Sequence, residues 1–166
     1  FGTNLSLASK VVSAVRKVST LPLITNLSPN VTKISDFAKA VVNEGSDIVS
    51  LINTFTGMAI DIETRKPKLA NITGGLSGPA IKPIAIKMVY EVASAVSVPI
   101  IGMGGIFTYE DAIEFMLAGA SAVAVGTANF IDPFAPIKIL NGIDSYLNSH
   151  KYKSVSEIIN TIDIKR

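Results

Sequence analysis

Hydrophobic positions along the chain alternate between helical spacing and short continuous runs, which predicts consecutive strand and helix units. Asn4 is a candidate N-cap for the first helix, and Gly45 and Gly119 follow the second and fourth helices where a left-handed residue often ends a helix. The helices expected from this pattern cover residues 4–18, 34–42, 81–96, 112–117, 136–147 and 154–162.

The apolar runs between the helices predict strands over residues 23–27, 47–53, 100–103 and 121–125. In the last run, Val alternates with small residues, and we expect this strand to be buried on both faces. Right-handed crossovers would place the four strands in sequential order, as in part of a barrel. The sequence therefore predicts the α/β class and the C-terminal half of a (β/α)₈ TIM barrel, with an open four-stranded α/β sheet as the alternative.

Residues 54–79 show no clear periodicity and are long for a connection between compact elements. Segments of this kind are often functional, so we expect a loop that serves the site.

The composition of the chain excludes several classes of function and of site. The 166 residues are 48% hydrophobic and 17% charged with a net charge of +2, which predicts one folded domain without a basic nucleic-acid or membrane footprint. The absence of Cys excludes disulfides, thiolate metal sites and a cysteine nucleophile among these residues, and a single His argues against an imidazole metal site. We expect a cytoplasmic protein. Because the chain begins without Met or a signal peptide, we also expect further chain upstream.

Candidate chemistry lies just after the strands, where parallel α/β folds bind ligands. Gly104-Gly105 and Gly126-Thr127 follow the last two strands and present backbone N–H groups without a Cβ, which favours a phosphate site. These glycines could alternatively serve only as tight turns. Asn53 and Thr54 end the second strand with groups that suit a planar heterocycle, although an Asn there is as often a loop cap.

Several motifs in this order resemble the dihydroorotate dehydrogenase family, and within it the catalytic FMN subunit of the NAD-linked, two-subunit type. The resemblance covers essentially the whole chain and is specific because it rests on a series of motifs. They are Leu27-Ser-Pro-Asn-Val-Thr32, Ile52-Asn-Thr54, Gly57-Met-Ala-Ile-Asp61, Thr64-Arg-Lys-Pro67, Leu69-Ala-Asn71, the stretch 73–83, Ile101-Gly-Met-Gly-Gly-Ile106 and Val125-Gly-Thr-Ala-Asn-Phe130.

The resemblance implies a barrel that holds FMN and oxidises dihydroorotate to orotate in de novo pyrimidine biosynthesis. Asn53 and Thr54 would then hold the pyrimidine. It further implies a homodimer of catalytic subunits, joined by a subunit whose FAD and [2Fe–2S] cluster pass electrons to NAD⁺. The positions that would contact FMN are Asn26, Ile52, Gly78, Gly104, Gly105, Gly126 and Thr127.

Two departures from the family pattern stand out. The family's catalytic base is a cysteine in an Asn-x-Ser-Cys-Pro-Asn loop that would precede this chain, so no catalytic residue is expected among the residues shown. Asn26 stands where the family has a flavin-contacting Lys, and loss of that cation predicts weaker FMN binding or an altered flavin potential.

Two other interpretations stay open. The dihydropyrimidine dehydrogenases share much of the strand-end pattern but act on a pyrimidine without a carboxylate. The other interpretation is a half-barrel without catalysis that acts as a binding or assembly module. The missing Cys and Asn26 favour this interpretation.

Overall fold

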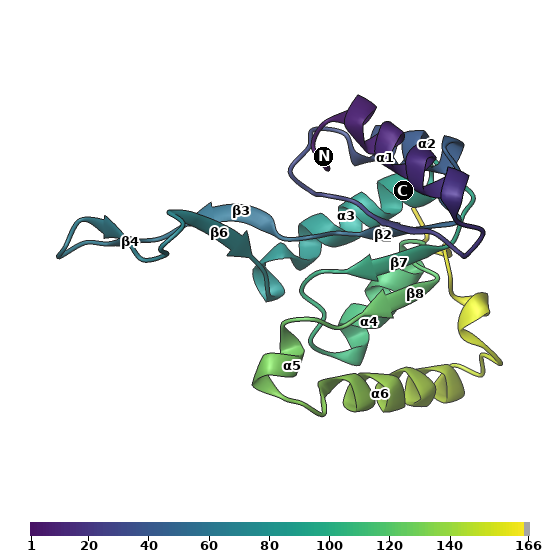
Figure 1. The fold of residues 1–166 in the computed structure, drawn as a ribbon. Coiled ribbons are helices and arrows are strands. Elements are labelled where there is room, and N and C mark those ends of the chain that lie inside the picture. Colours follow the sequence, from purple (N-terminus) through teal and green to yellow (C-terminus); the bar gives the residue numbers. More distant parts are fainter. Residues whose placement is uncertain (165–166) are drawn as a thin grey trace.

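A four-stranded parallel sheet forms the centre of the protein, whose computed structural model describes residues 1–164 (Figure 1). The strands β1 (Ile24–Asn26), β2 (Ile48–Leu51), β7 (Ile100–Met103) and β8 (Ala122–Ala124) lie side by side in the order β1-β2-β7-β8. Asn26 pairs with Ser50, Leu51 with Gly102 and Met103 with Ala124. This arrangement confirms the predicted α/β class and the sequential strand order expected for part of a barrel.

Helices connect and cover these strands. Their bounds are Leu5–Val18 (α1), Ile34–Asn43 (α2), Lys82–Ala93 (α3), Tyr109–Leu117 (α4), Ala128–Ile131 (α5) and Ala135–Ser149 (α6), with a 3₁₀ turn η1 at Pro79–Ile81. Asn4 is the N-cap of α1, since its side-chain oxygen accepts a hydrogen bond from the Leu7 amide at 3.0 Å. Gly45 and Gly119 follow α2 and α4 with φ values of 99° and 118°, as predicted. No helix among residues 1–164 is long and apolar enough to cross a bilayer.

The core lies where α2, α3 and α4 pack against the strands. Val49 and Leu51 of β2 are fully buried, as is Phe115 of α4. Gly102 makes room for Phe115, because a Cβ on Gly102 would lie 2.6 Å from the Phe115 ring. Burying a side chain of this size contributes about 1.5–3 kcal/mol, so this packing fixes β7 against α4.

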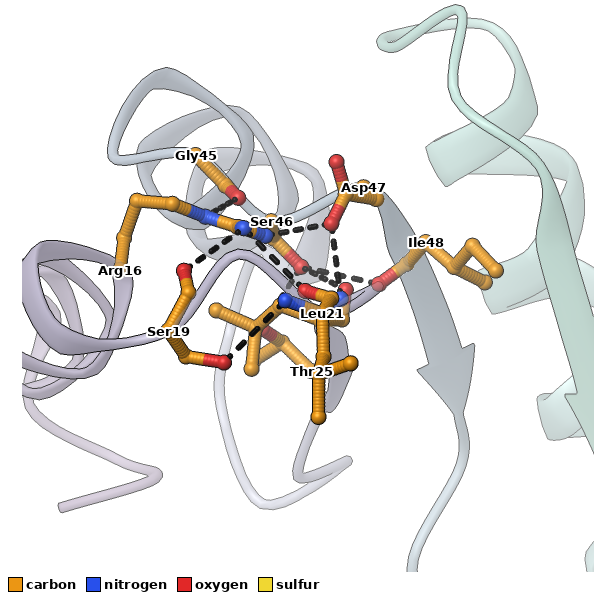
Figure 2. Close-up of polar contacts among 9 residues, drawn as sticks. Arg16, Ser19, Leu21, Thr25, Gly45, Ser46, Asp47 and Ile48 are labelled. Atoms are coloured by element: carbon orange, nitrogen blue, oxygen red, sulfur yellow. Dashed lines mark hydrogen bonds and ion pairs between the residues drawn. The ribbon is translucent and has the colours of Figure 1, made fainter.

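Arg16 ties the end of α1 to the starts of β1 and β2 (Figure 2). Its guanidinium donates to the carbonyls of Gly45 at 2.9 Å and Leu21 at 3.2 Å and pairs with Asp47. Asp47 also accepts a hydrogen bond from the Leu23 amide at 2.7 Å. The network lies at the amino ends of the strands, away from the ends where ligands bind in this class of fold.

Residues 55–76 form an antiparallel arm that projects from the body of the protein (Figure 1). β3 (Phe55–Met58) pairs with β6 (Thr73–Leu76), and β4 (Ile60–Asp61) pairs with β5 (Lys66–Pro67). The segment expected to be one long loop therefore contains paired strands, and its service to the site stays a prediction. Because both faces of the arm are largely exposed, its strands need no hydrophobic alternation, and the sequence pattern does not reveal them.

Two expectations were wrong. β8 is an edge strand of the described sheet, with Ala122 exposed and Val123 and Ala124 half-buried, instead of a strand buried on both faces. The expected helix over 154–162 is only a 3₁₀ turn, η2 (Val155–Glu157). Ser154 and Ser156 at this turn favour local hydrogen bonds over helix, and the Ser154 hydroxyl accepts from the Ser156 amide at 3.0 Å.

Candidate functional site

A cavity of about 220 Å³ opens at the carboxyl ends of the four parallel strands. The strands β1, β7 and β8 contribute their last residues to it, and the loops after β2, β7 and β8 contribute further residues. Of the nine predicted site residues, the structure brings eight together here, namely Asn26, Ile52, Asn53, Thr54, Gly104, Gly105, Gly126 and Thr127. Their roles toward a ligand stay predictions.

Gly78 is the predicted site residue that does not line the cavity. It is buried, has a φ of 97°, and lies behind the Gly104–Gly105 turn. A Cβ on Gly105 would come within 2.8 Å of the Gly78 carbonyl oxygen. In this structure Gly78 therefore supports the cavity wall from behind.

The two glycine turns differ in why they need glycine. Gly104 and Gly105 have φ values of 122° and 76°, and a Cβ on Gly105 would lie 2.9 Å from the Lys82 amide nitrogen. Glycine is therefore required there by the fold itself. A Cβ on Gly126 would meet nothing within 4 Å, so packing among the described residues does not require glycine at that position. Bare backbone beside an open cavity is the geometry that a phosphate group needs.

Asn53 and Thr54 contribute polar side chains to the cavity lining. The Ile52 amide donates to the Met103 carbonyl at 3.0 Å, and the Asn53 amide donates to the Leu27 carbonyl at 3.2 Å. The Asn53 side-chain oxygen accepts from the Thr54 amide at 2.7 Å. Because that oxygen is engaged, the NH₂ of Asn53 is the part of the side chain that can donate to a ligand carbonyl.

Asn30 and Ser77 support this site; both lie within motifs quoted from the sequence, but neither was predicted as a site residue. Asn30 donates to the Thr54 carbonyl at 3.0 Å and accepts from the Thr56 amide at 3.0 Å, which anchors the base of the arm. Ser77 lines the cavity and its hydroxyl accepts from the Thr127 hydroxyl at 2.9 Å. Asn30 lies in a loop that directly follows β1, and this position was the available signal for it.

A charged cluster lies beside the Gly104–Gly105 turn. Lys82 Nζ donates to Asp111 Oδ1 at 2.6 Å and to Glu114 Oε1 at 2.8 Å. The hydrogen bond to Asp111, followed by that to Glu114, raises the pKa of Lys82. Burial acts to raise the pKa of Asp111, but hydrogen bonds from Lys82, Phe107 and Thr108 outweigh it and lower that pKa. The two shifts favour the charged forms of Lys82 and Asp111.

The described lining residues of the cavity are uncharged. No Asp, Glu, His, Lys or Tyr is among its lining residues in the described chain, so these residues supply no general acid or base. Within residues 1–164, no group of three or more His, Asp or Glu side chains could hold a metal ion. Apolar side chains, including Ile52, Ile81 and Ile106, form much of the rest of the wall, as in most small-molecule sites.

The chain is similar to known proteins of one family. A family model described as dihydroorotate dehydrogenase matches residues 1–147. The chain is 60% identical over 159 residues to the protein of Alkaliphilus oremlandii named dihydroorotate dehydrogenase B (NAD(+)), catalytic subunit, covering 96% of this chain and 53% of that relative. It is 56% identical over 166 residues to the protein of the same name from Parabacteroides distasonis, covering 100% and 54%. The chain thus spans about half the length of the curated relatives it matches.

Proposed function

Because the chain belongs to the dihydroorotate dehydrogenase family, we propose that the full-length protein oxidises dihydroorotate to orotate with FMN in de novo pyrimidine biosynthesis. The observation that carries this proposal is the pairing of two features in one cavity. Bare backbone at Gly126 suits a phosphate, and Asn53 with Thr54 offers polar groups to a pyrimidine. The names of the relatives favour dihydroorotate over other dihydropyrimidines.

The chain would form the C-terminal half of a (β/α)₈ barrel, as one domain over residues 1–166. Four parallel strands in sequential order are half of the eight that close such a barrel. The relatives are about twice as long as the matched region, which leaves enough chain for four more units.

The residues present fit FMN. Gly104, Gly105, Gly126 and Thr127 would hold the phosphate with backbone N–H groups, and Asn26 and Ile52 would lie along the rest of the cofactor. Gly78 would act through the Gly104–Gly105 turn that it supports. When bound, FMN supplies the acceptor for the hydride that leaves the substrate.

This chain's own residues would bind and orient the substrate. The Asn53 NH₂ would donate to a ring carbonyl, and the Thr54 hydroxyl would add a second hydrogen bond that fixes the ring in its plane. The base that removes the ring proton would come from chain beyond these residues, since no Cys is present here. Substrate binding by these residues and a base from elsewhere agree with a cavity whose described lining carries no Asp, Glu, His, Lys or Tyr.

The protein would work with partners in the cytoplasm. The relatives are named catalytic subunits of an NAD(+)-linked enzyme, and this name calls for another subunit that delivers electrons to NAD⁺. We expect that subunit to carry FAD and a [2Fe–2S] cluster, and the catalytic subunits to form a homodimer.

The visible spectrum of the polypeptide that the complete gene encodes tests the cofactor. We expect the native protein to show flavin absorbance and to release FMN on denaturation. We also expect turnover of dihydroorotate but not of dihydrouracil.

The Asn26→Lys variant adds a cation at the cavity, so it should bind FMN more tightly. Asn141→Lys, which adds the same charge on exposed α6 outside the cavity lining, is the matched control.

Each alternative has its own outcome. A colourless protein that does not take up added FMN would contradict the proposal and leave a half-barrel without catalysis. Flavin binding with preference for dihydrouracil would instead point to a dihydropyrimidine dehydrogenase-like enzyme.

A further inference from the structure

The loop from Gly104 to Phe107 contributes four consecutive residues to the cavity wall, so its shape decides where backbone N–H groups point. The loop carries two successive glycines with positive φ. Such a segment is flexible in isolation and must be held in place by its neighbours.

Lys82 contacts the beginning of this loop. A Cβ on Gly105 would lie 2.9 Å from both the Cβ and the amide nitrogen of Lys82, so the two backbones are in close contact. Lys82 is the first residue of α3 and therefore presents a rigid helix end to the turn.

The same lysine reaches the end of the loop through Asp111. While Asp111 Oδ1 accepts from Lys82 Nζ at 2.6 Å, Asp111 Oδ2 accepts from the amides of Phe107 at 2.8 Å and Thr108 at 2.9 Å. The side chains of Lys82 and Asp111 are 24% and 14% exposed, so water screens this pair less than an ordinary surface pair. Glu114 adds a second carboxylate to the same ammonium group at 2.8 Å.

We propose that Lys82 is a positioning residue for the cofactor phosphate, because it fixes both ends of the Gly104–Phe107 loop. The inference rests on the proposed function for the identity of the ligand. Without the ammonium group, Asp111 and Glu114 would be like charges with no cation between them, and Asp111 would no longer be held against the Phe107 and Thr108 amides.

Lys82→Met in the full-length protein tests the role, because Met keeps most of the aliphatic side chain against Gly105 and removes the charge. We expect affinity for FMN to fall about tenfold while affinity for riboflavin, which lacks the phosphate, stays unchanged. Lys87→Met is the matched control, since Lys87 lies on the same helix and pairs only with Glu91 among the described ion pairs. It should leave both affinities unchanged.

Hydrogen exchange without added flavin gives a readout that does not depend on the cofactor. The amides of Phe107 and Thr108 should exchange faster in Lys82→Met than in Lys87→Met, and Lys82→Arg, which keeps the charge, should restore part of the protection. If Lys82→Met fails to fold, Asp111→Asn removes the same ion pair while it keeps an acceptor oxygen for the two amides, and it should show the same selective loss of FMN affinity.

The outcomes separate the two proposals. Equal loss of FMN and riboflavin affinity, or no loss of either, would overturn the positioning role, as would unchanged exchange at Phe107 and Thr108. A wild-type protein that binds neither flavin would contradict the proposed function, and the exchange comparison would still decide whether Lys82 holds the loop.

Discussion

Gly105 and Gly126 both line the cavity, yet a methyl group at each would have different consequences. At Gly105, φ is 76° and an added Cβ would lie 2.8 Å from the Gly78 carbonyl oxygen, so Gly105→Ala should cost about 1–3 kcal/mol of stability. At Gly126 nothing lies within 4 Å of an added Cβ, so Gly126→Ala should leave stability within about 0.5 kcal/mol of wild type.

The effect of Gly126→Ala on FMN affinity should be large although its effect on stability is small. Gly126→Ala places a methyl group where the phosphate would approach, so we expect FMN affinity to fall about tenfold in a well-folded protein. Urea unfolding and FMN titration of the full-length variants measure the two effects. If Gly126→Ala bound FMN as wild type does, the phosphate would have to lie elsewhere in the cavity.

The residues that line the cavity could largely be selected from the sequence. Asn53, Thr54, Gly104 and Gly126 could be selected because they follow predicted strands, and strand ends meet at one edge of a parallel sheet. Lys82 could not be selected, since its role depends on a helix end, a turn and α4 that only the folded chain brings together.

Among the elements, Asp47 is one of the residues that connect α1 to β1 and β2 (Figure 2). The hydrogen bond from the Leu23 amide, together with the Arg16 guanidinium, holds the pKa of Asp47 below its ordinary value of 3.8. Because the folded-state pKa is lowered, the stabilising contribution is complete above the ordinary value. It is lost as pH falls through the lowered one.

We therefore expect Asp47→Asn to be less stable than wild type at neutral pH and the difference to shrink in acid. Urea unfolding of the full-length protein between neutral pH and pH values below 3.8 measures this convergence. A double-mutant cycle with Arg16→Gln isolates the share that belongs to the ion pair. A difference that stayed constant down to the lowest pH would contradict the assignment to the Asp47 charge.

Helices with one buried and one exposed face could be predicted from their hydrophobic spacing. α2 and α4 show this pattern clearly, and both end near their predicted glycines. The arm of residues 55–76 was missed because neither face is buried, and β8 is more exposed than expected because it lies at the edge of the described four-stranded sheet.

At the scale of the whole molecule, the face formed by α5 and α6 is the feature that a closed barrel must account for. Phe130, Ile131, Phe134, Ile137 and Leu140 are 56–92% exposed. Beside them, α6 and β8 line a groove with Val123, Val125, Ile139 and Ile143. In a closed (β/α)₈ barrel the last strand lies next to the first, so further chain would cover this groove.

Leu140→Asp in the full-length protein tests closure. If barrel units beyond these residues bury Leu140, the variant should lose about 2 kcal/mol or more relative to wild type, from lost apolar burial and an uncompensated charge. Asn141→Asp places the same carboxylate on the neighbouring exposed position of α6 and should cost less than about 0.5 kcal/mol. Urea unfolding midpoints compare the two. Equal stability of both variants would mean that this face stays in solvent, which would favour the open four-stranded sheet over the closed barrel.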